Sequence, residues 1–361
     1  HSKLSAAIKL IAVAPMCFLS AQTLALEELD GTTKDVYPVT YVDNFRLKNN
    51  ATLNVHNGGT VRDIQSVGST VNLTGARVSS TASTTAVILT NSTAHINNTL
   101  ITSTRAGGLD VVRNPSTLTG SLAEVSNNSE IHGATYGANV TSYSTLNLND
   151  SKLIGGSQAG LILRGGAANA VNSQIIGATD GIRMTREHST VPNSPELRLE
   201  GTRVEGLTGS AIVVDTPITA EIDVNNGSTL IGNNGNLLEL KTGGNANMRV
   251  NNSALTGNIQ VGTGSALDLS VDSAIMNGDV INNGGTASVG LNNGSVLTGR
   301  LENVDKLAIN SDATWVMVDN QQVGDLSLNG GNIKFGDTGH FYQLDVENLS
   351  GNGTFLMSVD F

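Results

Sequence analysis

A five-residue phrase recurs through the middle of this chain at a nearly constant interval. It reads Ser or Thr, any residue, an aliphatic residue, a spacer and Gly, with one extra residue in the seventh copy. The copies are SEIHG (Ser129–Gly133), SKLIG (Ser151–Gly155), SQIIG (Ser173–Gly177), TRVEG (Thr202–Gly206), STLIG (Ser228–Gly232), SALTG (Ser253–Gly257), SAIMNG (Ser273–Gly278) and SVLTG (Ser295–Gly299). Their glycines are separated by 22, 22, 29, 26, 25, 21 and 21 residues. Such a step is typical of a solenoid, in which insertions leave the stack as loops.

The residues around each phrase indicate short strands joined by sharp corners. Asn, Asp or Gly commonly precedes the phrase, as at Asn172 and Asn226, and these residues tolerate left-handed backbone conformations. Apolar and polar residues alternate ahead of the corner, as in Leu146–Leu148, and a second short strand follows the Gly, as in Gly160–Leu163. No stretch has a convincing helical period. The pattern therefore predicts an all-β parallel β-helix with about 22 residues per turn.

Two other repeat architectures have related patterns. A leucine-rich repeat also uses Leu-x-Leu, but the spacers here are Gly, Asn, Thr and Ser, with no returning helix. A propeller would need longer blades and more aromatic residues. Ser116–Gly120 (STLTG) also fits the phrase but precedes Gly133 by only 13 residues, so the spacing carries more weight than any single copy.

The N-terminal segment is similar to a secretion signal. Lys3 and Lys9 precede the apolar run Leu10–Leu19, and Ser20–Ala25 ends in small residues, so we expect residues 1–25 to be a cleaved signal peptide. A short buried helix is the alternative. Cleavage would remove Cys17, the one cysteine, and leave an exported chain without disulfides. The formal net charge of −11 argues against nucleic acid as a partner.

Motifs of known catalytic chemistry are absent from the sequence. It has no G-x-S-x-G, H-E-x-x-H, P-loop or G-G-x-G-x-D, and the histidines lack metal-like spacing (His56, His95, His132, His188 and His340). We therefore expect no catalytic, cofactor-binding or metal-ligating residue and no cofactor, and the ligand-binding residues stay unassigned.

The densest polar insertion is Arg183–Glu196, inside the 29-residue step, with Pro192 and Pro195 that interrupt strands. Its Arg183, Arg186, Glu187 and His188 could bind a ligand or act on a polysaccharide beside an acidic neighbour. The simpler interpretation, which we favour, is a solvated loop.

The last 55 residues have a different composition from the repeats. No Phe, Tyr or Trp occurs between Ser144 and Thr314, whereas Trp315, Phe335, Phe341, Tyr342, Phe355 and Phe361 lie in the last 47 residues. Bulky aromatic groups suit a terminus that closes the core by different packing. We expect a β-helix over residues 26–306 and a β-rich capping module over residues 307–361.

This terminal segment also resembles a known family. Ala313–Met317 (ATWVM), Val323–Leu326 (VGDL), Phe341–Leu344 (FYQL) and Leu349–Phe355 (LSGNGTF) are similar to the end of a pertactin-like autotransporter passenger, where the autochaperone or junction segment lies. The resemblance covers about 50 residues and agrees in architecture elsewhere. It implies a right-handed β-helix exported through the periplasm to the cell surface of a Gram-negative bacterium, or secreted, with the autochaperone folding first.

The family's β-barrel translocator has no counterpart in the sequence given, which holds no ~10-residue alternating strands of that kind. We expect a fragment or a truncated gene product. The Arg-Gly-Asp of the pertactin type is also absent.

Two classes of function remain open at this stage. The first is a non-enzymatic passenger, an adhesin or aggregation factor that binds host cell-surface or matrix molecules or sister bacterial cells, or a stalk for another domain. The second is a β-helix polysaccharide lyase or glycoside hydrolase, which needs carboxylates with Arg or Lys, or paired acids, across adjacent coils. We favour the non-enzymatic passenger because acidic residues do not recur in register.

Overall fold

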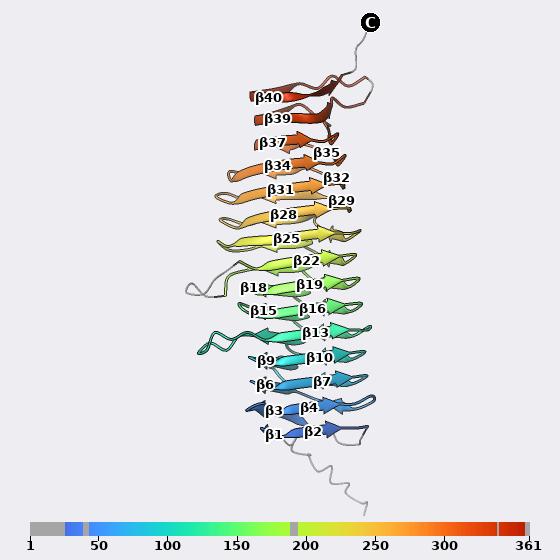
Figure 1. Ribbon diagram of the computed structural model, residues 1–361, viewed down its shortest axis with the longest axis vertical. Coiled ribbons are helices and arrows are strands. Elements are labelled where there is room, and N and C mark those ends of the chain that lie inside the picture. Colours follow the sequence, from blue (N-terminus) through green and yellow to red (C-terminus); the bar gives the residue numbers. More distant parts are fainter. Residues whose placement is uncertain (1–25, 39–42, 188–193, 338, 358–361) are drawn as a thin grey trace, which may run out of the picture.

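A computed structural model describes residues 26–38, 43–187, 194–337 and 339–357. The chain rises through a stack of about 15 turns, with strand β1 at one end of the rod and β40 at the other (Figure 1). None of the described residues is helical. The expected parallel β-solenoid is confirmed, and the leucine-rich repeat is excluded.

Each turn contributes strands to up to three parallel ladders. Sheet A runs from one end of the rod to its penultimate turns. Its strands are β1 (Leu26–Asp30), β3 (Asn44–Lys48), β6 (Ile64–Val67), β9 (Val87–Thr90), β12 (Leu109–Val112), β15 (Ala138–Thr141), β18 (Leu161–Arg164), β21 (Ile182–Met184), β24 (Ile212–Val214), β27 (Asn236–Leu240), β30 (Asn258–Val261), β33 (Val280–Asn282) and β36 (Leu301–Glu302).

Sheet B is the ladder that extends furthest. Its strands are β2 (Thr33–Val36), β4 (Thr52–Val55), β7 (Thr70–Thr74), β10 (Thr93–Asn97), β13 (Leu122–Ser126), β16 (Thr145–Asn149), β19 (Ala167–Val171), β22 (Glu196–Glu200), β25 (Thr219–Asn225), β28 (Asn245–Asn251), β31 (Ala266–Asp272), β34 (Thr286–Asn292), β37 (Val304–Asn310), β39 (Gln321–Lys334) and β40 (Leu344–Leu356).

Sheet C follows sheet B across a sharp corner in each turn. Its strands are β5 (Thr60–Val61), β8 (Arg77–Ser80), β11 (Leu100–Ser103), β14 (Glu130–Gly133), β17 (Lys152–Gly155), β20 (Gln174–Gly177), β23 (Arg203–Gly206) and β26 (Thr229–Gly232). The same face continues as β29 (Ala254–Thr256), β32 (Ile275–Asn277), β35 (Val296–Thr298) and β38 (Thr314–Val316). The long strand β39 pairs with both β37 and β38, so sheets B and C merge there.

The core is a set of apolar ladders, because inward residues of successive turns lie in register. In sheet A, Leu161 lies opposite Ile182, which lies opposite Ile212, and all three are buried. Alternating buried and exposed residues along most strands place the polar side chains outside. A dry core this narrow is filled by aliphatic residues, which explains the long stretch without aromatic groups.

The Ser or Thr of the repeated phrase has a structural role at the corner between sheets B and C. Ser151 N–H donates to Ser173 Oγ at 3.1 Å, Ser173 N–H to Thr202 Oγ1 at 3.2 Å, and Thr202 N–H to Ser228 Oγ at 3.1 Å. Each hydroxyl donates in turn to a corner carbonyl, as Ser173 does to Val171 O at 2.7 Å. The phrase thus encodes a buried hydroxyl ladder that satisfies backbone groups the sharp corner leaves unpaired.

The extra residue of the seventh copy is explained by the register. Ala254 pairs with Ile275, so Ala274 occupies the ladder position of Ser253, and Ser273 lies exposed with a left-handed φ of 50°. Ser116–Gly120 belongs to a loop outside the sheets, in agreement with the spacing argument.

The C-terminal segment continues the same ladders. Strand β37 crosses residue 307 without a break, and Trp315 is fully buried with its indole N–H donating to Gly299 O at 3.0 Å. Strand β40 is the last layer over β39 and is largely exposed, as are Phe341 and Leu349. The division at residue 307 therefore remains a prediction about folding, and the expected signal peptide lies outside the described residues.

Candidate functional site

The strongest concave site on the described surface lies on the outer face of sheet A. It is a cleft of about 380 Å³ that spans the turns of β18, β21 and β24. Its lining residues are Gln158, Ala159, Ile162, Arg164, Thr179, Arg183, Thr185 and Asp215. Two sets of turn loops border it: the connections that precede the sheet A strands and those that follow them.

Register explains why these side chains meet. Asn139, Ile162, Arg183 and Val213 lie opposite one another on successive strands, and each is the middle, outward residue of its strand. Ile162 and Val213 are nonetheless buried, because neighbouring side chains and loops cover them. The cleft therefore has an apolar floor and polar walls.

Arg183 is the central charged group of the cleft. Its guanidinium donates to Asp180 Oδ2 at 2.5 Å and to Asp215 Oδ2 at 2.8 Å. Asp180 is almost buried whereas Asp215 is about one third exposed, and the two carboxylates raise the pKa of Arg183 against the opposing effect of burial. The arrangement is a fixed array of donors and acceptors whose charges largely cancel.

A hydrogen-bonded network extends from the cleft toward the N-terminal end of the rod. Tyr136 Oη donates to Asp110 Oδ1 at 3.0 Å and lies 3.0 Å from Thr85 Oγ1, while Asn139 Nδ2 donates to Asp110 Oδ1 at 3.2 Å. Arg164 Nε donates to Asn139 Oδ1 at 3.2 Å and so links the network to the cleft.

Two groups of this network have raised pKa values. Burial raises the pKa of Asp110, against the lowering effect of its hydrogen bonds with Thr85, Tyr136 and Asn139. Burial, with the nearby Asp110 carboxylate, raises the pKa of Tyr136 to about 12. Both groups are therefore less acidic than in an unfolded chain, and any stability they contribute declines as the pH rises.

The described start of the Arg183–Glu196 insertion is held against neighbouring turns. Arg186 Nη2 donates to Pro217 O at 3.0 Å, and Glu187 pairs with Arg113 Nε at 2.8 Å and accepts from Ser142 N–H at 2.9 Å. Arg113 and Glu187 are 11% and 17% exposed, so this ion pair is mostly shielded from water. These contacts differ from the solvated loop that the sequence favoured, whereas His188 lies outside the described residues.

Sequence reasoning considered Arg183, Arg186 and Glu187 but missed Asp110, Tyr136 and Asp180. Only Arg183 of the first group lines the cleft. The missing signal was register: outward residues of sheet A become neighbours only when the 22- and 29-residue steps are aligned strand by strand. Acidic residues come together here from loops and strands, without recurring at one position of the repeat.

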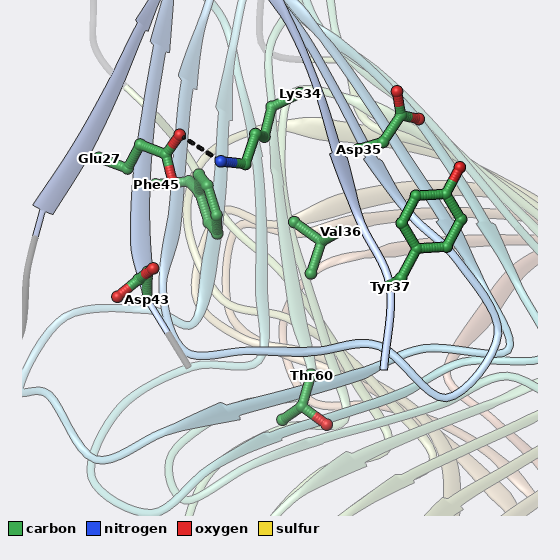
Figure 2. A pocket seen from close by; sticks show the side chains of 8 residues that line it. All are labelled: Glu27, Lys34, Asp35, Val36, Tyr37, Asp43, Phe45 and Thr60. Atoms are coloured by element: carbon green, nitrogen blue, oxygen red, sulfur yellow. Dashed lines mark ion pairs between the residues drawn. The ribbon is translucent and has the colours of Figure 1, made fainter. Parts of the chain in front are cut away.

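A second cavity of about 280 Å³ lies at the N-terminal end of the rod (Figure 2). Figure 2 shows the Glu27–Lys34 ion pair, 2.9 Å long, above Phe45 and Val36, with Tyr37 to one side. Phe45 and Val36 are part of the hydrophobic core. This cavity is the end of the apolar stack, and it lacks the converging polar groups of the sheet A cleft.

Metal-ligating side chains do not gather anywhere in the described part of the chain, where no three of His, Cys, Asp and Glu could hold an ion. His95 and His132 instead pair singly with Glu124 and Glu130, at 2.7 and 2.9 Å. Within residues 26–357, gaps excepted, no helix is long and apolar enough to cross a membrane.

Comparison with known proteins gives two partial relatives. The chain is 36% identical over 96 residues to a probable autotransporter, YcgV, of Escherichia coli K12, which covers 24% of this chain and 10% of that protein. It has the same identity over 96 residues to a putative uncharacterised YcgV protein of Escherichia coli O157:H7, covering 17% of it. No family model matches the chain. The match and the β-solenoid are consistent with an autotransporter passenger.

Proposed function

We propose that this chain is the exported, non-enzymatic passenger of a bacterial autotransporter and that it acts as an adhesin or aggregation factor. The observation that supports this most directly is the combination of a solenoid of about 15 turns with partial identity to a probable autotransporter. A rod of this kind presents a long surface for contact, since each turn adds side chains to the same outer faces.

The ionic groups of the cleft also favour binding over catalysis. Arg183 is held between two carboxylates, and Arg113 is paired with Glu187, so these groups are positioned by one another. A general base needs a pKa near the working pH and access to its proton. Asp110 has a raised pKa, but its carboxylate accepts hydrogen bonds from Tyr136 and Asn139 within the network.

Binding of the purified full chain tests the proposal. We expect saturable binding to cultured epithelial cells or to immobilised extracellular matrix, or faster settling of a bacterial suspension, with heat-denatured chain as the control. Absence of all three effects, with the solenoid intact by circular dichroism, would remove the basis for an adhesin.

One observation favours the alternative of a polysaccharide lyase or glycoside hydrolase. Asp180, Arg183 and Asp215 bring two carboxylates and a guanidinium together in a cleft of a β-solenoid. Such groups are of the kinds that cleave glycosidic bonds. Clear production of reducing ends or unsaturated uronates from pectin-like polymers, abolished by Asp215→Asn, would replace our proposal with this one.

We further propose that residues 1–25 direct export, that the passenger is of the pertactin-like type, and that residues 307–361 act as an autochaperone. The fully buried Trp315 and the merging of sheets B and C at β39 support a stable terminal segment. Pulsed hydrogen exchange during refolding tests the last point: amides of β37 to β39 should become protected before those of β10 to β20.

A further inference from the structure

Two exposed residues adopt a backbone conformation that is costly for them. Of the 17 non-Gly residues with positive φ among those described, 15 are Asn, Asp or Ser, which tolerate this region. The exceptions are Leu118, with φ of 58°, and Tyr143, with φ of 63°. Their exposed fractions are 45% and 51%, so core packing does not account for either side chain.

Tyr143 occupies a turn position that other turns of the rod give to residues without this cost. Ser144 N–H donates to Thr141 O at 3.0 Å, which makes Tyr143 the third residue of a four-residue turn between sheets A and B. The corresponding turns Lys241–Gly244 and Gly262–Ser265 have Gly243 and Gly264 at the third position, with φ of 78° and 69°. A left-handed third residue is the usual place for Gly in such a turn.

The turn is fixed by its surroundings and lies beside the sheet A cleft. Glu187 accepts from Ser142 N–H, and Ser142 Oγ donates to the carbonyl of Arg164, whose side chain lines the cleft. The loop that carries Leu118 ends against the same turn, since a side chain at Gly120 would collide with the carbonyl oxygen of Tyr143. A strained, exposed aromatic residue is thus held rigidly at the rim of a polar cleft, as strained residues are at binding sites.

The chemistry of the cleft selects the ligand. Arg164 and Arg183 provide two positive charges, and Asp180 and Asp215 provide two negative ones, so the net charge of the cluster is zero. Paired guanidinium and carboxylate groups offer fixed donors and acceptors, which suit hydroxyl groups because a hydroxyl both donates and accepts. A sugar ring combines a rim of hydroxyls with an apolar C–H face that stacks on an aromatic ring.

We propose that the sheet A cleft, with Tyr143 at its rim, binds an uncharged glycan. One sugar ring stacks on Tyr143, and the next residues of the glycan place their hydroxyls against Arg164, Arg183 and Asp215. This inference rests on the proposed adhesin function and names the chemistry of its ligand. It also explains why a turn that would accept Gly carries Tyr.

The variant Tyr143→Gly separates binding from stability. Isothermal titration calorimetry of the full chain would use hexasaccharides of glucose (α-1,4 and β-1,4), xylose and N-acetylglucosamine, with hexagalacturonate as an anionic comparison. We expect at least one neutral hexasaccharide to bind the native chain and to bind Tyr143→Gly about tenfold more weakly or worse. Because Gly relieves the left-handed strain, the thermal midpoint should be unchanged or ~1–3 °C higher.

Gly264→Tyr is the matched control, since it places Tyr in the same kind of turn away from the cleft. It should lower the thermal midpoint and leave glycan binding unchanged. Equal binding by the native chain and Tyr143→Gly, or no binding of any neutral hexasaccharide, would overturn the glycan site. If the chain still clumps bacteria or binds host cells in that case, the adhesin proposal stands with a protein ligand; loss of both activities removes both proposals.

Discussion

The middle of the rod and its C-terminal shaft share one kind of turn but differ in how many residues leave the sheets. Between β28 and β37 the steps are 21 residues, and the A-to-B corners are small turns with Gly at the left-handed position, as at Gly243 and Gly264. Between β12 and β24 the steps lengthen to 29 residues, and ion pairs cross several turns, as between Arg113 and Glu187. The middle also holds the sheet A cleft and the strained Tyr143.

This difference separates residues that maintain the stack from residues that do other work. A repeated turn is stabilised mainly by its neighbours, so a regular shaft needs only aliphatic ladders and cheap corners. Departures that raise the cost of a turn, such as Tyr at a Gly position, are not explained by the stack itself. Functional residues should therefore be sought where the repeat is irregular, and the following changes test that rule.

Trp315→Ala should have the largest effect, because it strikes the regular end of the rod. Trp315 is fully buried and its N–H donates to Gly299 O. We expect a loss of about 3–5 kcal/mol in the free energy of unfolding. Guanidinium denaturation measures this, with Phe335→Ala as a milder control because Phe335 is only partly buried. Ligand binding at the cleft should survive wherever the variant remains folded; a loss confined to binding would contradict the division between the two regions.

Glu187→Ala strikes the staple of the irregular region. It would leave the mostly buried Arg113 without its carboxylate and Ser142 N–H without an acceptor. We expect destabilisation of about 2–3 kcal/mol, below that of a fully buried pair, and faster tryptic cleavage at Arg186. Limited proteolysis followed by mass spectrometry reports the site of cutting. Glu205→Ala, which breaks a pair within one strand, is the control and should leave Arg186 protected.

The sequence was sufficient to predict the stack and insufficient to predict the cleft. The spacing of Ser129, Ser151 and Ser173 follows directly from the length of a turn, so one chain reveals it. The contact between Arg183 and Asp215 depends on the sheet register across a 29-residue step, and no local pattern encodes it. The positive φ of Tyr143 was hidden as well, since Thr-Ser-Tyr-Ser carries no turn residue of the usual kind.

The pH dependence of stability should distinguish the Tyr136 network from the shaft. The folded-state pKa of Tyr136 is about 12, above its ordinary value of 10.0, so its stabilising contribution is complete below pH 10 and is lost as the pH rises through 12. The loss is of order 2 kcal/mol, since each pKa unit corresponds to about 1.4 kcal/mol and the group is partly solvated. Thermal midpoints from pH 9 to 12 should fall less steeply for Tyr136→Phe than for the native chain. Parallel curves would show that the network has no part in alkaline unfolding.

The smallest effect concerns the hydroxyl ladder, where two serines of the same phrase should behave differently. Ser173 is buried and its Oγ accepts from Ser151 N–H, whereas Ser273 is exposed beside Ala274, which takes the ladder position. Ser173→Ala should cost about 1–2 kcal/mol, because a buried N–H loses its acceptor. Ser273→Ala should change stability by less than about 0.5 kcal/mol. Ser173→Thr should rescue the loss, since Thr202 fills the same position in the next turn. Equal costs at Ser173 and Ser273 would mean that the phrase stabilises the corner through its strand register alone.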